Sequence, residues 1–244
     1  MKMRHNKFTL VELLVVICIA SLLMGVVLPA FNRMVTGSAV DRLTSNLKVR
    51  LERTQSHAAS ERRHIALILP SGSDWTASDK DGRSRNGGSR MCIVATPGSD
   101  YSAEFKKWIS DEDWELPERG ALLVYVSKDD PLETVNNEVV LKNDITKNGG
   151  SIARKTASLM TPETSGNDKP LKDISGLAGG TKSNCAIIYA PDGSVCSAGD
   201  IYLVIHEAMK NTDGSFVFPG GGVEFRNFRV LKINRLTGKV EYHR

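Results

Sequence analysis

Residues 7–17 read Lys-Phe-Thr-Leu-Val-Glu-Leu-Leu-Val-Val-Ile, and one carboxylate, Glu12, interrupts an otherwise apolar run. From Leu13 to Leu28 no residue carries a charge. A lone acid inside a membrane-spanning helix costs about 2.5–3.5 kcal/mol on insertion scales, so such a residue is a functional candidate. Its natural partner is a cation at the same depth. Cleavage of the chain between Lys7 and Phe8 would create that cation, the new α-amino group of Phe8.

This segment resembles the prepilin-type leader of type IV pilins and type II secretion pseudopilins. The resemblance implies that a prepilin peptidase cuts between Lys7 and Phe8 and that Phe8 is then N-methylated. It makes Glu12 the fifth mature residue and Pro29 the twenty-second, where pilins usually carry a helix-kinking proline. The chain departs from the family at Lys7, because the family usually has glycine before the cut.

The apolar run also predicts membrane insertion. Residues 8–30 would form a helix about 34 Å long at about 1.5 Å per residue, enough to cross a hydrocarbon core of about 30 Å. The cations before the run predict a cytoplasmic N-terminus. We therefore expect a single-pass protein of the cytoplasmic (inner) membrane with a periplasmic or extracellular C-terminal domain, associated with a fibre when assembled. An ordinary signal peptide would have a shorter run and a small-x-small cleavage site, and a plain signal anchor would not explain Glu12.

The helical pattern continues beyond the apolar run. One apolar stripe recurs at steps of three and four residues: Val40, Leu43, Leu47, Leu51, Thr54 and Ala58. No proline lies between Pro29 and Pro70, so we expect one helix from about Phe8 to Glu61, bent at Pro29. This predicts four regions: a leader (1–7), a transmembrane half-helix (8–30), an amphipathic half-helix (31–63) and a β-rich head (64–244).

The head is expected to be mostly antiparallel sheet. Its strand candidates are Ile65–Leu69, Met91–Ala95, Ala121–Val126, Val139–Leu141, Ala186–Ala190, Ile201–His206, Phe228–Asn234 and Lys239–His243. Phe105–Trp108 is expected to be a short helix or a loop. Residues 128–182 are rich in polar and turn residues and are interpreted as an insertion with one or two short strands. The predicted fold class is α+β and pilin-like, with a long N-terminal helix, its first half transmembrane and its second half packed on an antiparallel sheet.

Four shorter segments resemble one branch of the pilin family, the H-type minor pseudopilins and their FimT-like relatives. They occur in the order of that branch: Leu51–Ile68, Trp114–Gly120, Ile188–Ser194 and Leu236–Val240. Some FimT-like pilins serve DNA uptake and grip DNA with a Gly-Arg-x-Arg pattern in the last hairpin. The matching residues here are Gly238-Lys-Val-Glu241, so the second cation is replaced by an anion and phosphate contact is weakened. Nucleic-acid binding is therefore not the expected function.

The charge balance of the chain also gives no support for nucleic-acid binding. The chain has 244 residues, with 32 Lys and Arg against 28 Asp and Glu. Lys2, Arg4 and Lys7 precede the predicted cut, which leaves 29 basic residues against 28 acidic ones. The mature protein is thus nearly neutral, and its charge gives no argument for a nucleic-acid partner.

The sequence contains no pattern that indicates an enzyme, a metal site or a cofactor. The histidines lack metal-ligand spacing and have no nucleophile motif nearby. Cys185 and Cys196 flank a hairpin-like segment and form the likeliest disulfide, although a tight turn at Asp192-Gly193 would not place them directly opposite.

These observations predict a structural subunit, a minor pilin or pseudopilin of a type II secretion pseudopilus or a type IV pilus-like fibre. Its expected partners are other pilins or pseudopilins, the prepilin peptidase and an inner-membrane assembly platform. Glu12 would pair with a Phe8 amine and set the register between subunits. Two alternatives stay open: a competence pilin that contributes to DNA uptake, and a membrane-anchored outer domain that does not polymerise.

Overall fold

A computed structural model gives the architecture of the chain. It describes residues 10–69, 88–101, 103–115, 120–135, 138–142, 153–155, 158–160, 183–210, 216–217 and 227–243. Within α1, it describes residues 26–37 by their backbone alone.

The first element is a single helix of 52 residues, α1 (Leu10–Glu61). Its C-terminal half buries the stripe of residues expected from the sequence, including Val40, Leu47 and Leu51, against the head. The helix ends where Arg62 adopts a φ of 53° and the Arg63 amide donates to the Ala58 carbonyl at 3.2 Å. A left-handed residue of this kind satisfies the last helical carbonyls and turns the chain away from the helix axis.

Five strands form a closed barrel in the order β1-β2-β3-β8-β9. They are β1 (Ile65–Ile68), β2 (Arg90–Val94), β3 (Ala103–Trp108), β8 (Ser158–Met160) and β9 (Ser183–Tyr189). Strand β1 lies between β2 and β9 and is antiparallel to both, and all four of its residues are buried. Strand β8 is parallel to β3 and antiparallel to β9, so it closes the ring.

A second sheet follows the order β13-β12-β10-β4-β7, and a short strand β11 also pairs with β10. The strands are β4 (Gly120–Ser127), β7 (Ala153–Lys155), β10 (Ile201–Lys210), β11 (Phe216–Val217), β12 (Phe228–Ile233) and β13 (Val240–His243). A separate hairpin pairs β5 (Leu132–Val135) with β6 (Glu138–Leu141).

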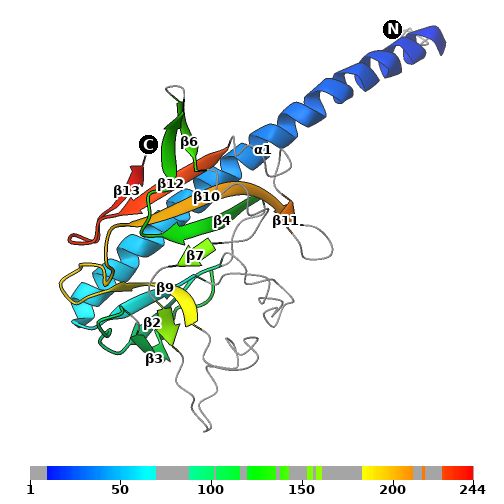
Figure 1. Cartoon of the computed structure of the whole chain (residues 1–244). Coiled ribbons are helices and arrows are strands. Elements are labelled where there is room, and N and C mark those ends of the chain that lie inside the picture. Colours follow the sequence, from blue (N-terminus) through cyan, green and yellow to red (C-terminus); the bar gives the residue numbers. More distant parts are fainter. Residues whose placement is uncertain are drawn as a thin grey trace.

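The C-terminal half of α1 packs on both sheets, against β4, β10 and β12 of the open sheet and against β1 of the barrel. Its apolar stripe joins a core that includes Leu123, Leu203 and Leu231. Each such side chain contributes about 1.5–3 kcal/mol when it is fully buried. Figure 1 shows the sheets gathered along this half of α1, while the N-terminal half extends away from them.

The predicted fold class needs two corrections. The first concerns the membrane. In the part of the chain that the structure describes, no helical stretch is both long and apolar enough to cross a bilayer. The predicted transmembrane half and the single-pass placement in the inner membrane are therefore not supported.

The second correction concerns the sheet. The head is not one antiparallel sheet, because its strands form a barrel, an open sheet and a hairpin, with parallel pairing of β3 with β8 and of β4 with β7. The segment 128–182 contains four described strands, β5 to β8, where one or two were expected. Strands β7 and β8 complete the open sheet and the barrel, so this segment is in part integral to the fold. Residues 105–108 are also a strand and not a helix or loop.

Candidate functional site

The first candidate site is the exposed N-terminal half of α1. Apart from Glu12 and Ser21, its described side chains are apolar, and they are largely open to solvent, with Leu10 80% and Leu22 74% exposed. The five consecutive residues Leu13–Ile17 are all exposed large apolar residues. Successive residues of an α-helix are about 100° apart, so these five cover the whole circumference. This half of the helix is therefore apolar on every face, which is typical of a helix that becomes buried on all sides.

Glu12 lies within this half, in the first turn of α1, and is exposed. A carboxylate near a helix N-terminus is favoured by the helix dipole. Lys7 and Phe8 lie outside the described residues, so the predicted cleavage, N-methylation and pairing with Glu12 stay predictions. Pro29 lies within the continuous helical backbone of α1, and the bend expected there likewise stays a prediction.

Arg50 joins α1 to the loop after β3. It is buried, donates to the Ser89 hydroxyl at 2.9 Å and forms ion pairs with Glu112 and Glu115. Arg53 adds a second contact to Glu112, between Nη2 and Oε1 at 2.6 Å. Burial lowers the pKa of the Arg50 guanidinium, while Glu115 and Glu112 oppose that shift. We refer to Arg50, Arg53, Glu112 and Glu115 as the ion cluster.

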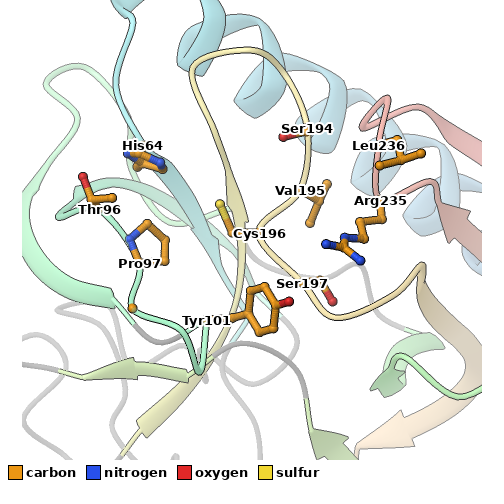
Figure 2. Close-up of a pocket in the computed structure, with 11 residues that line it drawn as sticks. His64, Thr96, Pro97, Tyr101, Ser194, Val195, Cys196, Ser197, Arg235 and Leu236 are labelled. Atoms are coloured by element: carbon orange, nitrogen blue, oxygen red, sulfur yellow. The ribbon is translucent and has the colours of Figure 1, made fainter.

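The second candidate site is a pocket of about 300 Å³ beyond the C-terminal end of α1. Four separate segments line it: His64, residues 96–98 with Tyr101, residues 194–197, and Arg235 with Leu236. In the view of Figure 2, His64 and Pro97 lie on one side of Cys196, and Arg235 lies on the other.

Tyr101 lines the same pocket in an unusual backbone conformation, with a φ of 63°. Its amide donates to the Gly98 carbonyl at 3.0 Å, which closes the turn. Left-handed residues other than glycine cost about 1–3 kcal/mol and concentrate at functional sites. The turn thus places a large polar aromatic side chain at the pocket at a conformational cost.

Gln55 of α1 holds two walls of this pocket together. Its Nε2 donates to the Gly193 carbonyl at 2.9 Å and to the Thr237 carbonyl at 2.6 Å. The amide of Val195 also donates to the Arg235 carbonyl at 2.8 Å. The β9–β10 turn and the β12–β13 turn are therefore fixed to each other and to the helix. The sequence near Gln55 could not predict this role, because its two hydrogen-bond partners lie far away in the chain.

His64 and Cys196 of the pocket are both uncharged at neutral pH. Burial lowers the pKa of His64, and the nearby Asp192 opposes that change. Burial, with a further contribution from Asp192, raises the pKa of the Cys196 thiol. A protonated thiol beside a neutral imidazole is the opposite of an activated thiolate–imidazolium pair. The pocket therefore does not resemble a thiol active site.

The predicted disulfide between Cys185 and Cys196 is not formed, because Cys196 carries a free thiol. The Cys196 amide donates to the Ile188 carbonyl at 2.8 Å, so this residue lies beside Ile188 and not beside Cys185. Cys185 is three residues away along the strand, about 10 Å at about 3.3 Å per residue. A disulfide needs Cα atoms within about 7 Å.

Most of the described cations near the C-terminus are paired. Three ion pairs form there: Arg229 with Asp41 at 2.9 Å, Lys232 with Asp200 at 2.9 Å and Lys239 with Glu241 at 2.6 Å. Lys239 and Glu241 occupy the positions that correspond to the two arginines of the DNA-gripping pattern. Their mutual pairing reduces the positive charge available for phosphate.

No group of three metal-ligating side chains occurs within the residues that the structure describes. Comparison of the chain with protein-family models, curated proteins and solved structures found no match.

Proposed function

We propose that this chain is a structural subunit of a type II secretion pseudopilus or a type IV pilus-like fibre and not a catalyst. Its N-terminal helix would pack among the helices of neighbouring subunits after cleavage at the Lys7–Phe8 junction. The observation that carries the proposal is the apolar surface on every face of the N-terminal half of α1. One partner helix would cover one face of this segment, whereas a bundle of helices covers all of them.

The position of Glu12 also supports this proposal. Exposed at the start of α1, the carboxylate would become buried when other helices surround it. Burial of a charge is costly unless a cation accompanies it, so arrangements that bring a cation to Glu12 would be favoured. The α-amino group of Phe8, in the same or a neighbouring subunit, would meet this need and fix the axial register.

DNA uptake receives less support as an alternative. The terminal hairpin positions that correspond to the DNA-gripping arginines are occupied by Lys239 and Glu241, which pair with each other. An anion at the second position repels phosphate. A competence role that does not involve direct DNA contact would use the same helix packing.

Site-specific photo-cross-linking in the host tests the proposal. A photoreactive phenylalanine analogue in place of Leu14, in the exposed apolar half, should yield adducts with the helices of other fibre subunits. The matched control is Val49, which is 61% exposed but lies in the half of α1 that packs on the head; it should yield none of these adducts. Glu12→Ala should lower the Leu14 adduct yield severalfold without lowering the amount of protein.

Two results would contradict the proposal. One is a Leu14 probe that gives no protein adducts while the protein accumulates normally. The other is an equal set of adducts from Leu14 and Val49, because this would mean that the apolar half has no specific partner.

A further inference from the structure

We propose that the pocket beyond the C-terminal end of α1 binds a carboxylate-bearing ligand that has an apolar group beside its carboxylate. The pocket lies at the end of the helix opposite the exposed apolar half, so this inference does not depend on the proposed fibre function. It is carried by a cation that has no carboxylate partner in the described part of the chain, a set of hydrogen-bond donors and an adjoining apolar wall.

Arg235 provides the positive charge. Three other cations of the same region are paired with carboxylates, but within the described residues the Arg235 guanidinium has no carboxylate at ion-pair distance. Its Nη1 donates to the Ala198 carbonyl at 3.2 Å, and its backbone amide donates to Asp200 Oδ1 at 2.8 Å. A guanidinium has five N–H donors, so the anchored side chain keeps donors for a ligand. The planar fork of these donors matches the two oxygens of a carboxylate.

The remaining polar groups favour an anion over a cation. Tyr101, Ser197 and the neutral imidazole of His64 each offer a hydrogen-bond donor to the pocket. The carboxylate of Asp192 lies near His64, and its Oδ1 accepts from both the amide and the hydroxyl of Ser194 at 2.9 and 2.6 Å. Its charge disfavours an anion on the His64 side, and this assigns the ligand carboxylate to the Arg235 side.

The pocket also has an apolar surface. Pro97 and Val195 line it, and Leu236 at its rim is 77% exposed, which is high for a large apolar side chain. A volume of about 300 Å³ is at the small end of ligand sites. It suits a group about the size of one amino-acid residue, such as the last residue of a peptide. Because Gln55 already fixes the walls, binding would require little reordering of the protein.

The test uses the full-length protein in a mild detergent and measures binding by titration calorimetry. The first pair of probes is N-acetyl-leucine and N-acetyl-leucinamide, which differ in the carboxylate. We expect saturable binding of the acid and at least about tenfold weaker binding of the amide, because a hydrogen bond to a charged group contributes about 1.5–3 kcal/mol.

Two variants separate the pocket from general electrostatics. Arg235→Gln should weaken binding of the acid by about five- to tenfold, and it retains the backbone contact to Asp200. Arg229→Gln removes the same charge from a cation that is paired with Asp41 and does not line the pocket, so it should leave binding unchanged. Thermal unfolding of both variants identifies any loss of fold.

Further probes distinguish the sources of the carboxylate. They are a hexapeptide that ends in a free leucine carboxylate, its C-terminal amide, and the same amide with an internal glutamate. If the peptide with the free C-terminal carboxylate binds most tightly, the ligand is a protein C-terminus. If the amide with the internal glutamate binds most tightly, the ligand is an acidic side chain. If N-acetyl-leucine binds most tightly, the ligand is a small organic acid. Equal binding of acid and amide, binding that Arg235→Gln does not change, or no saturable binding by any probe would overturn the proposal. None of these results would affect helix packing at the other end of the molecule.

Discussion

Gly238 allows two turns to approach more closely than any side chain would permit. Its φ is 66°, and a Cβ atom built there would lie 2.1 Å from the Gly193 carbonyl oxygen and 2.5 Å from Gln55 Nε2. The Gly193 carbonyl oxygen belongs to the backbone, so it cannot move away from a new Cβ atom as the end of a flexible side chain could. Gly238 is thus required both for its left-handed conformation and for the space that it leaves, and Gln55 depends on it for both of its hydrogen bonds.

Replacement of this glycine provides a direct test. We expect Gly238→Ala to lower the free energy of unfolding by about 2–4 kcal/mol, from backbone strain together with displacement of the turn. Gly199→Ala is the matched control, because a Cβ there meets nothing within 4 Å, and its effect should stay below about 1 kcal/mol. Chemical denaturation followed by tryptophan fluorescence measures both. Similar losses in the two variants would show that the close approach is not what requires Gly238.

His206 couples stability to pH. It lies in the central strand β10, is 1% exposed, and burial lowers its pKa to about 4. The unfolded chain holds this proton with a pKa of about 6.5. Below that value the unfolded state binds more protons, so the contribution of His206 is complete above about pH 6.5 and is lost as the pH falls toward 4. The loss amounts to about 3 kcal/mol at pH 4.

The expected result is a free energy of unfolding that falls between pH 6.5 and 4, and less steeply in His206→Leu. The control His57→Leu changes a partly exposed histidine near the end of α1 and should retain the steep dependence. Denaturation curves at pH 7.5, 6, 5 and 4 give the comparison. Parallel pH profiles for the native chain and His206→Leu would contradict this account, because carboxylates would then explain the whole effect.

At the scale of elements, the ion cluster fastens α1 to the loop after β3. Removal of Arg50 takes away one of the two cations that contact the buried Glu112, so Arg50→Met should cost about 1.5–3 kcal/mol. Lys48→Met is the control: Lys48 pairs with Glu52 at 3.8 Å on the exposed side of the same helix, and its loss should cost less than about 1 kcal/mol. Chemical denaturation of both variants gives the two free energies of unfolding to compare. An effect of Arg50→Met as small as that of Lys48→Met would mean that the cluster adds little to the packing of α1.

The same scale shows what the sequence could and could not predict. The prediction of the buried stripe on α1 was correct. When one side of a helix is buried, apolar residues recur every three or four positions, and this pattern is visible within a single segment of sequence. Strand β3 was missed although Ala103 and Phe105 are buried and Glu104 and Lys106 are exposed, a clear alternation within a segment of mixed character. The burial of Arg50 could not be predicted, because the residues that cover it, Ser89 and Glu112, come from distant parts of the chain.

For the molecule as a whole, local sequence patterns could not predict that the barrel closes. Strand β8 reads Ser-Leu-Met and lies in a polar stretch, so nothing in its own sequence marks it as a structural strand. Its pairing with β3 and β9 is decided by tertiary contacts, which override weak local preference. The pocket escaped prediction for a similar reason, since its lining comes from four segments that meet only in the folded chain.

The pairing of β1 with β9 has a consequence for synthesis. The register joins Ile65 to Tyr189. During synthesis, the apolar strand β1 therefore cannot pair with β9 until more than a hundred further residues have been made. Contacts of such long range are slow to form, and unpaired strand edges promote aggregation in the meantime. A growing polypeptide of this kind would depend on chaperones until residue 189 has left the ribosome or the translocation channel.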